Sequence, residues 1–184
     1  DVYKRQEHYI ISSGLREIIE GTAIAKDFTH IYASSFYYNE HGEPCWPAQV
    51  INYTNKTQFL FRIEKGILDI NDNAVNDHFV EGELRVPFRN IVYIGDSATD
   101  IPCMRLVNSL GGHSVGVYDL ENTDSKDTVC RMIRDERIRY YVPADYTKGS
   151  EMDTLMHQII DKTAAYEVLE EKHLRDRKEA IGCN

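Results

Sequence analysis

Ile91-Val-Tyr-Ile-Gly-Asp-Ser-Ala-Thr-Asp100 is the stretch of sequence that decides the fold of this chain. A short apolar run ends at Gly95, and carboxylates follow at Asp96 and Asp100. Continuous apolar runs of this length are typical of strands buried in a sheet, and ligands of open α/β sheets collect beyond the carboxyl ends of such strands. We therefore predict that Asp96 and Asp100 lie in a crevice at the edge of a sheet.

The two carboxylates also predict a metal site. Nearby negative charges repel each other, and a hard cation that prefers oxygen ligands, such as Mg²⁺, makes their proximity favourable. The alternative is a surface turn, because Gly-Asp-Ser is also ordinary turn chemistry. The residues of this loop alone leave both interpretations open.

Composition narrows the class of protein. A chain of 184 residues is long enough for one domain with a core that buries roughly 70% of the unfolded surface. The formal net charge of -9, from 30 acidic and 21 basic residues, argues against a nucleic-acid partner, which needs a basic face. The apolar runs fall short of the ~20 residues that cross a bilayer, and the four separated cysteines suit a reduced, cytoplasmic protein without a membrane partner.

The first residues are unusual. Asp1-Val-Tyr-Lys-Arg-Gln6 lacks an initiator methionine and resembles the in-frame translation of a transposon adaptor used to prepare sequencing libraries. We expect residues 1–6 to be such an artefact, and the natural sequence upstream of about Glu7 to be missing. A mature N-terminus or a cloning boundary is the alternative.

The remaining pattern alternates strands with helices. The first half predicts a strand, turn and helix over residues 8–19, a hairpin over 29–53, and a helix from 54–57 onward with Phe59, Leu60 and Ile63 on its apolar face. The second half predicts a loop region over 71–89, strands at 91–95, 114–118 and 139–142, and helices after Pro102, over 124–137 and from Ser150. This order implies an α/β fold with a mainly parallel sheet flanked by helices. We expect a core domain over residues 7–164 and a charged helical extension over 165–184.

Three features occur in an order that matches a known family. An apolar strand ends at Ser12, Lys56 stands at a helix start, and a second apolar strand ends before Asp96 and Asp100. In this order and spacing, over about residues 7–162, the chain resembles the haloacid dehalogenase-like hydrolases, specifically their phosphoserine phosphatase-like branch. The resemblance implies a Rossmann-like fold and a Mg²⁺-dependent phosphatase that acts on a small phosphorylated metabolite.

Two parts of the family pattern are missing. The first motif, Asp-x-Asp-x-Thr or Val, carries the nucleophilic aspartate and should lie upstream, but it is nowhere in this chain. The helical cap that governs substrate choice in this branch is missing as well. The resemblance therefore implies a piece of a longer enzyme that lacks its first core strand.

The resemblance also implies which residues bind the phosphate group of the substrate. Ser12 would donate its hydroxyl to a phosphate oxygen, with help from the backbone N–H groups of Ser13 and Gly14 at a helix N-terminus. Lys56 would place its ammonium against the same phosphate. Read without the family, Ser12 is equally a helix cap and Lys56 a surface charge.

Asp96 and Asp100 would complete the site as metal-binding residues. Asp96 would bind Mg²⁺ directly, while Asp100, counted with Ser12 and Lys56 among the catalytic residues, would orient a metal-bound water or Lys56. In the complete protein, an upstream aspartate would attack a phosphate monoester and form an aspartyl-phosphate that water hydrolyses.

Two other functions stay open. A noncatalytic phosphate-binding or regulatory α/β module would use the same residues without a nucleophile. A hydrolase that displaces halide or acyl groups could use the same scaffold, because fold does not fix function. The acidic pair argues against the latter, since such enzymes need no Mg²⁺.

Overall fold

The structure is a computed structural model that describes residues 6–182. The chain divides into two compact units, one of Glu7–Tyr141 and one that contains residues 142–182. The predicted artefact at residues 1–6 lies outside the described residues except for Gln6, and so do the last two residues of the predicted extension. Within residues 6–182, no helix combines the length and the apolar character needed to span a membrane.

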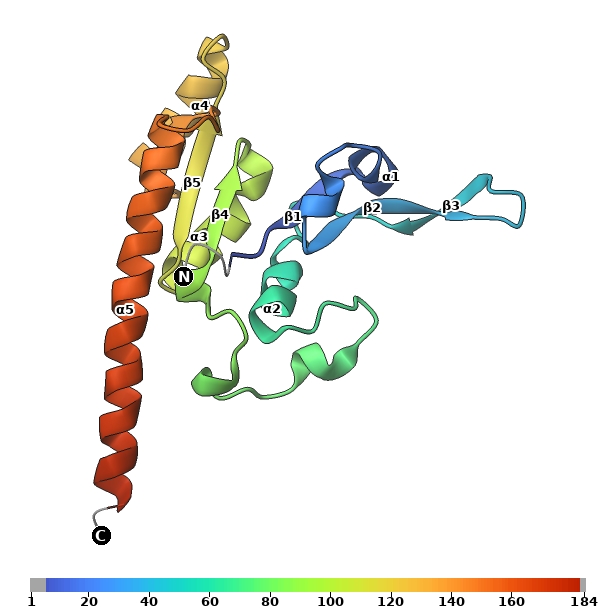
Figure 1. Ribbon diagram of the computed structural model, residues 1–184. Helices are drawn as coiled ribbons and strands as arrows, with labels where there is room; N and C mark the ends of the chain where they lie inside the picture. Colours follow the sequence, from blue (N-terminus) through green and yellow to red (C-terminus); the bar gives the residue numbers. More distant parts are fainter. Residues whose placement is uncertain (1–5, 183–184) are drawn as a thin grey trace. The chain divides into compact units, whose positions relative to one another are not determined.

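The first sheet contains the predicted hairpin (Figure 1). Strands β1 (Tyr9–Leu15) and β2 (His30–Tyr38) are parallel, and β3 (Pro44–Gln49) pairs with β2 in the antiparallel direction. Their order is β1-β2-β3, so that β1 is an outer strand. The predicted hairpin is confirmed, whereas the turn predicted at residues 12–14 lies inside β1.

The second sheet contains the strand that ends at Gly95. Strands β4 (Val92–Gly95) and β5 (His113–Tyr118) are parallel and in register, and β6 (Tyr140–Pro143) completes the order β4-β5-β6. The sequence predicted one mainly parallel sheet, but the structure has two three-stranded sheets. The described strands form a mixed α/β fold in which β1 and β4 are both outer strands of their sheets.

The helices follow the predicted start and stop signals. They are α1 (Arg16–Glu20), α2 (Thr57–Lys65), α3 (Ile101–Ser109), α4 (Thr123–Arg134) and α5 (Glu151–Gly182). Helix α2 ends at Gly66, whose φ of 74° places it in the left-handed region that glycine adopts at low cost. Pro102 lies in the first turn of α3, where its missing N–H removes no helical bond. The loop region predicted over 71–89 contains short 3₁₀ turns.

Helix α5 begins at the predicted place and is capped by Ser150. The backbone N–H of Asp153 donates to the Ser150 hydroxyl at 3.1 Å, and the Asp153 carboxylate accepts the N–H of Gly149 at 2.8 Å. This is a capping box displaced by one residue, because the carboxylate reaches the residue before the cap. The helix predicted from Ser150 and the predicted charged extension form one continuous helix within the described residues.

The unit of Glu7–Tyr141 has two clusters of buried side chains that share α2. One cluster surrounds β4, β5, α3 and α4, and it consists of Leu60, Phe88, Ile91, Tyr93, Cys103, Met104, Val107, Tyr118, Val129, Met132 and Ile138. The other consists of Tyr32, Ile51, Phe59 and Ile63 beside the first sheet. Leu60 of α2 therefore belongs to one cluster while its neighbour Phe59 belongs to the other. Ile11 of β1 packs against both.

This shared helix gives a test of the packing. Leu60 is 2% exposed, and truncation of a buried leucine typically costs about 2–5 kcal/mol because it leaves a cavity. We expect Leu60→Ala to lower the free energy of unfolding by that amount in equilibrium denaturation. Leu110→Ala is the matched control, since Leu110 is 45% exposed, and we expect it to cost less than about 1 kcal/mol. Equal losses in the two variants would contradict the assignment of Leu60 to the core.

Candidate functional site

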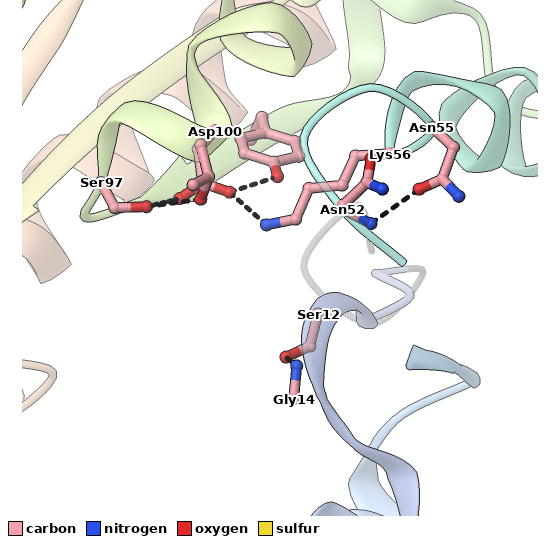
Figure 2. Close-up of polar contacts among 9 residues, drawn as sticks. Ser12, Gly14, Asn52, Asn55, Lys56, Ser97 and Asp100 are labelled. Atoms are coloured by element: carbon pink, nitrogen blue, oxygen red, sulfur yellow. Dashed lines mark hydrogen bonds and ion pairs between the residues drawn. The ribbon is translucent and has the colours of Figure 1, made fainter. Parts of the chain in front are cut away.

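A buried ion pair joins two of the residues predicted to form the site. The Lys56 ammonium lies 2.7 Å from Asp100 Oδ1, although 44 residues separate them in sequence. Lys56 is 5% exposed and Asp100 6% exposed. Figure 2 shows the lysine side chain extending from the turn before α2 to the loop after β4. The structure therefore brings Lys56 and Asp100 together and excludes the interpretation of Lys56 as a surface charge.

Asp100 has two further partners, which sequence reasoning missed. The Tyr93 hydroxyl donates to Oδ1 at 2.8 Å, and the Ser97 hydroxyl donates to Oδ2 at 3.1 Å. Burying a carboxylate is costly unless donors satisfy it, and here three donors do so. The sequence offered one signal for Tyr93. Side chains alternate between the two faces of a strand, which places Tyr93, two residues before Gly95, on the buried face of β4.

Gly95 makes room for the aspartate. A Cβ atom at this position would lie 2.8 Å from both Cβ and Cγ of Asp100. Any other residue would therefore force Asp100 or the end of β4 to shift. Glycine at this position therefore permits the close approach of the Asp100 side chain.

A network of asparagines organises the turn that carries Lys56. The backbone N–H of Asn52 donates to Asn55 Oδ1 at 2.8 Å, and the Asn55 side chain donates to the carbonyl of Val50 at 2.9 Å. The N–H of Lys56 then donates to the carbonyl of Asn52 at 3.2 Å. The predicted cap of α2 at residues 54–57 is thus a compact turn, with no side-chain cap bond at Lys56 itself.

Ser12 lies in a different setting from the one predicted. Helix α1 has five residues and begins at Arg16, so Ser13 and Gly14 precede the helix and lie in extended backbone. The N–H of Gly14 donates to Ser12 Oγ at 3.0 Å, which assigns that amide to the serine rather than to a bound anion. This bond uses a lone pair of the Ser12 oxygen and leaves its proton to donate elsewhere.

The structure leaves two predicted residues outside the ion pair. Within residues 6–182, no hydrogen bond or ion pair connects Ser12 or Asp96 to Lys56 or Asp100. Figure 2 shows Ser12 and Gly14 on a segment separate from the loop of Asp100. Asp96 is exposed directly after β4.

These contacts determine whether the described residues can bind a metal ion. The described residues contain no group of three or more His, Cys, Asp or Glu side chains arranged to hold a metal. Asp100 directs both oxygens to protein donors, so it suits the predicted role of orienting Lys56 better than that of a direct ligand. Asp96 is the exposed carboxylate that this loop offers to a cation. These residues alone do not complete a Mg²⁺ site.

Burial sets the ionisation of the groups beside Asp100. It raises the pKa of Tyr93 far above its ordinary value, which keeps the hydroxyl protonated and able to donate to Asp100. Burial also raises the pKa of Cys103 to about 11, and this thiol is 0% exposed. Cys103 is therefore a small side chain that fills the core, with its thiol protonated at neutral pH.

The fold and this ion pair define an α/β protein with a buried lysine–aspartate pair at the carboxyl end of a strand. No protein-family profile matches the chain. It is similar to an uncharacterized protein of Borreliella burgdorferi strain B31, with 25% identity over 158 aligned residues that cover 78% of this chain. The chain spans about half the length of that relative, 54%.

The ion pair predicts a large loss of stability when it is broken. Lys56→Ala would leave Asp100 buried without its cation, which typically costs about 3–5 kcal/mol. Arg16→Ala is the control, because it breaks the exposed Arg16–Glu20 pair at a cost below about 1 kcal/mol. Equilibrium denaturation of both variants measures the difference. A cost for Lys56→Ala no larger than the control's would contradict the burial of the pair.

We expect Cys45 and Cys103, two of the four cysteines, to differ in reactivity. Cys45 is exposed, whereas Cys103 is buried and its raised pKa keeps the thiol protonated until the pH approaches about 11. Because the thiolate is the reactive form, we expect iodoacetamide at pH 8 to modify Cys45 and to spare Cys103 until the chain unfolds. Mass spectrometry of digested protein measures both sites. Equal modification of the native chain would contradict the placement of Cys103.

Proposed function

We propose that this chain is part of a haloacid dehalogenase-like phosphatase of the phosphoserine phosphatase-like branch. The complete protein would hydrolyse phosphate monoesters of small metabolites in the cytoplasm, with Mg²⁺ and through an aspartyl-phosphate. The observation that carries the proposal is the buried contact between Lys56 and Asp100, because the family pattern assigns these two residues to one site.

The sheet topology supports the same proposal. Strand β2 lies beside β1, β4 lies beside β5, and both pairs are parallel. A doubly wound sheet has the strand order 3-2-1-4-5, in which the first strand lies between the second and the fourth. If β1 and β2 are the second and third strands of such a sheet, and β4 and β5 the fourth and fifth, then one further strand joins the two sheets. The resemblance assigns the nucleophilic aspartate to that first strand.

The residues of this chain would divide the work of binding phosphate. Phosphoryl transfer depends mainly on positioning and on neutralising the phosphate oxygens. Ser12 would donate its hydroxyl proton to one phosphate oxygen, because its own oxygen already accepts a hydrogen bond from the N–H of Gly14. The Lys56 ammonium would bind the phosphate, and its ion pair with Asp100 would hold that ammonium in position.

The proposal includes a Mg²⁺ ion, which Asp96 would bind. A divalent cation would neutralise phosphate charge when bound, and Asp96 would hold it from the rim of β4. Its other ligands would come from outside the described residues. Asp100 would act on the lysine, as its contacts favour.

The test uses the longer gene product that the proposal implies. We expect it to hydrolyse p-nitrophenyl phosphate with Mg²⁺ and to lose turnover in EDTA. Lys56→Ala should lower kcat/KM by about 10²–10³, the usual effect of removing one preorganised donor. Asp96→Asn should raise the Mg²⁺ concentration needed for half-maximal rate, whereas Asp77→Asn, an exposed control, should not.

The alternatives give other results. Turnover that is equal in Asp96→Asn and Asp77→Asn would refute the proposed metal role. Phosphate binding without turnover would favour the noncatalytic module. Hydrolysis that is independent of metal would favour the hydrolase that displaces halide or acyl groups.

A further inference from the structure

Strand β1 contains an irregularity next to Ser12. Ile11 pairs with Tyr32 of β2, and the next paired residue of β1 is Leu15, opposite Ser34. Residues 12–14 therefore stand opposite the single residue Ala33. Such a bulge takes backbone groups out of the ladder, and these groups need other partners.

Ser34 supplies a hydrogen-bond partner for one backbone group of the bulge. Its hydroxyl donates to the carbonyl of Ser13 at 3.2 Å. The same oxygen accepts the backbone N–H of Ile51 at 3.0 Å. One hydroxyl thus connects the bulge that carries Ser12 to the segment that follows β3.

That segment leads directly to Lys56. Ile51 is 2% exposed and belongs to the buried cluster with Phe59, so the packing of its side chain holds its backbone in place. Asn52 follows, and its carbonyl accepts the N–H of Lys56 at 3.2 Å. A continuous series of contacts therefore runs from the Ser13 carbonyl through Ser34 to the turn of Lys56.

We propose that Ser34 is a positioning residue that fixes the bulge of Ser12 relative to the turn of Lys56, so that a serine hydroxyl and an ammonium address one phosphate group. This inference rests on the proposed function and goes beyond it, because neither the family pattern nor the comparison with the relative assigns Ser34 a role. Ser34 does not touch the phosphate in this proposal.

The first experiment titrates inorganic phosphate into the 184-residue chain and follows backbone amides by NMR. We expect Ser34→Ala to weaken phosphate binding about five- to tenfold, because the substitution removes both hydrogen bonds that connect the bulge to the segment before Lys56. Ser34→Thr keeps the hydroxyl and suits a strand, so it should restore affinity to within about twofold of the wild type. Ser35→Ala is the matched control on the same strand and should leave affinity unchanged.

The second experiment needs no phosphate. The amides of Gly14 and Lys56 make no bond to Ser34, but they lie at the two ends of the connected segments. We expect Ser34→Ala to accelerate hydrogen exchange at both amides by at least about fivefold, and Ser35→Ala to accelerate neither. A merely local role would accelerate exchange at Ile51 alone.

The outcomes separate the two proposals. If the wild-type chain binds no phosphate, the proposed phosphate site is wrong, and the exchange rates still decide whether Ser34 couples the two segments. If the wild type binds phosphate but Ser34→Ala matches Ser35→Ala in affinity, or exchange at Gly14 and Lys56 is unchanged, the role of Ser34 is wrong and the phosphate site stands.

Discussion

The buried ion pair between Lys56 and Asp100 constrains the rest of the unit of Glu7–Tyr141. Two opposite charges at 2.7 Å are favourable in the interior only when their remaining donors and acceptors are satisfied. Tyr93 and Ser97 satisfy the carboxylate, Gly95 leaves room for it, and the asparagine turn presents the lysine. The loop after β4 and the turn before α2 must therefore meet at a fixed place.

Local signals in the sequence predicted much of this framework. The hairpin, Pro102 in α3 and the strand that ends at Gly95 each depend on a few neighbouring residues, and the structure contains all of them. The contact of Lys56 with Asp100 was predictable as well, but only through the family pattern. Nothing in the composition of the turn around Lys56 distinguishes it from an exposed one.

What the sequence could not predict depends on contacts between distant segments. Tyr93 holds Asp100 through a hydroxyl, and its periodicity indicates burial but not which partner that hydroxyl meets. The bulge in β1 arises from pairing with β2, so residues 12–14 were interpreted as a turn at a helix start. The division into two sheets likewise depends on which strands pair, a property that no single segment carries.

Helix α2 has a consequence for how the unit responds to heat. Its adjacent residues Phe59 and Leu60 face different buried clusters, so neither cluster can lose this helix while the other keeps it. The same helix begins immediately after Lys56. Fraying of its first turn would therefore loosen both clusters and release the lysine in one event. Thermal melting of the two sheets and loss of the charged pair should coincide, which makes the geometry of the ion pair and the packing a single cooperative property of nine helical residues.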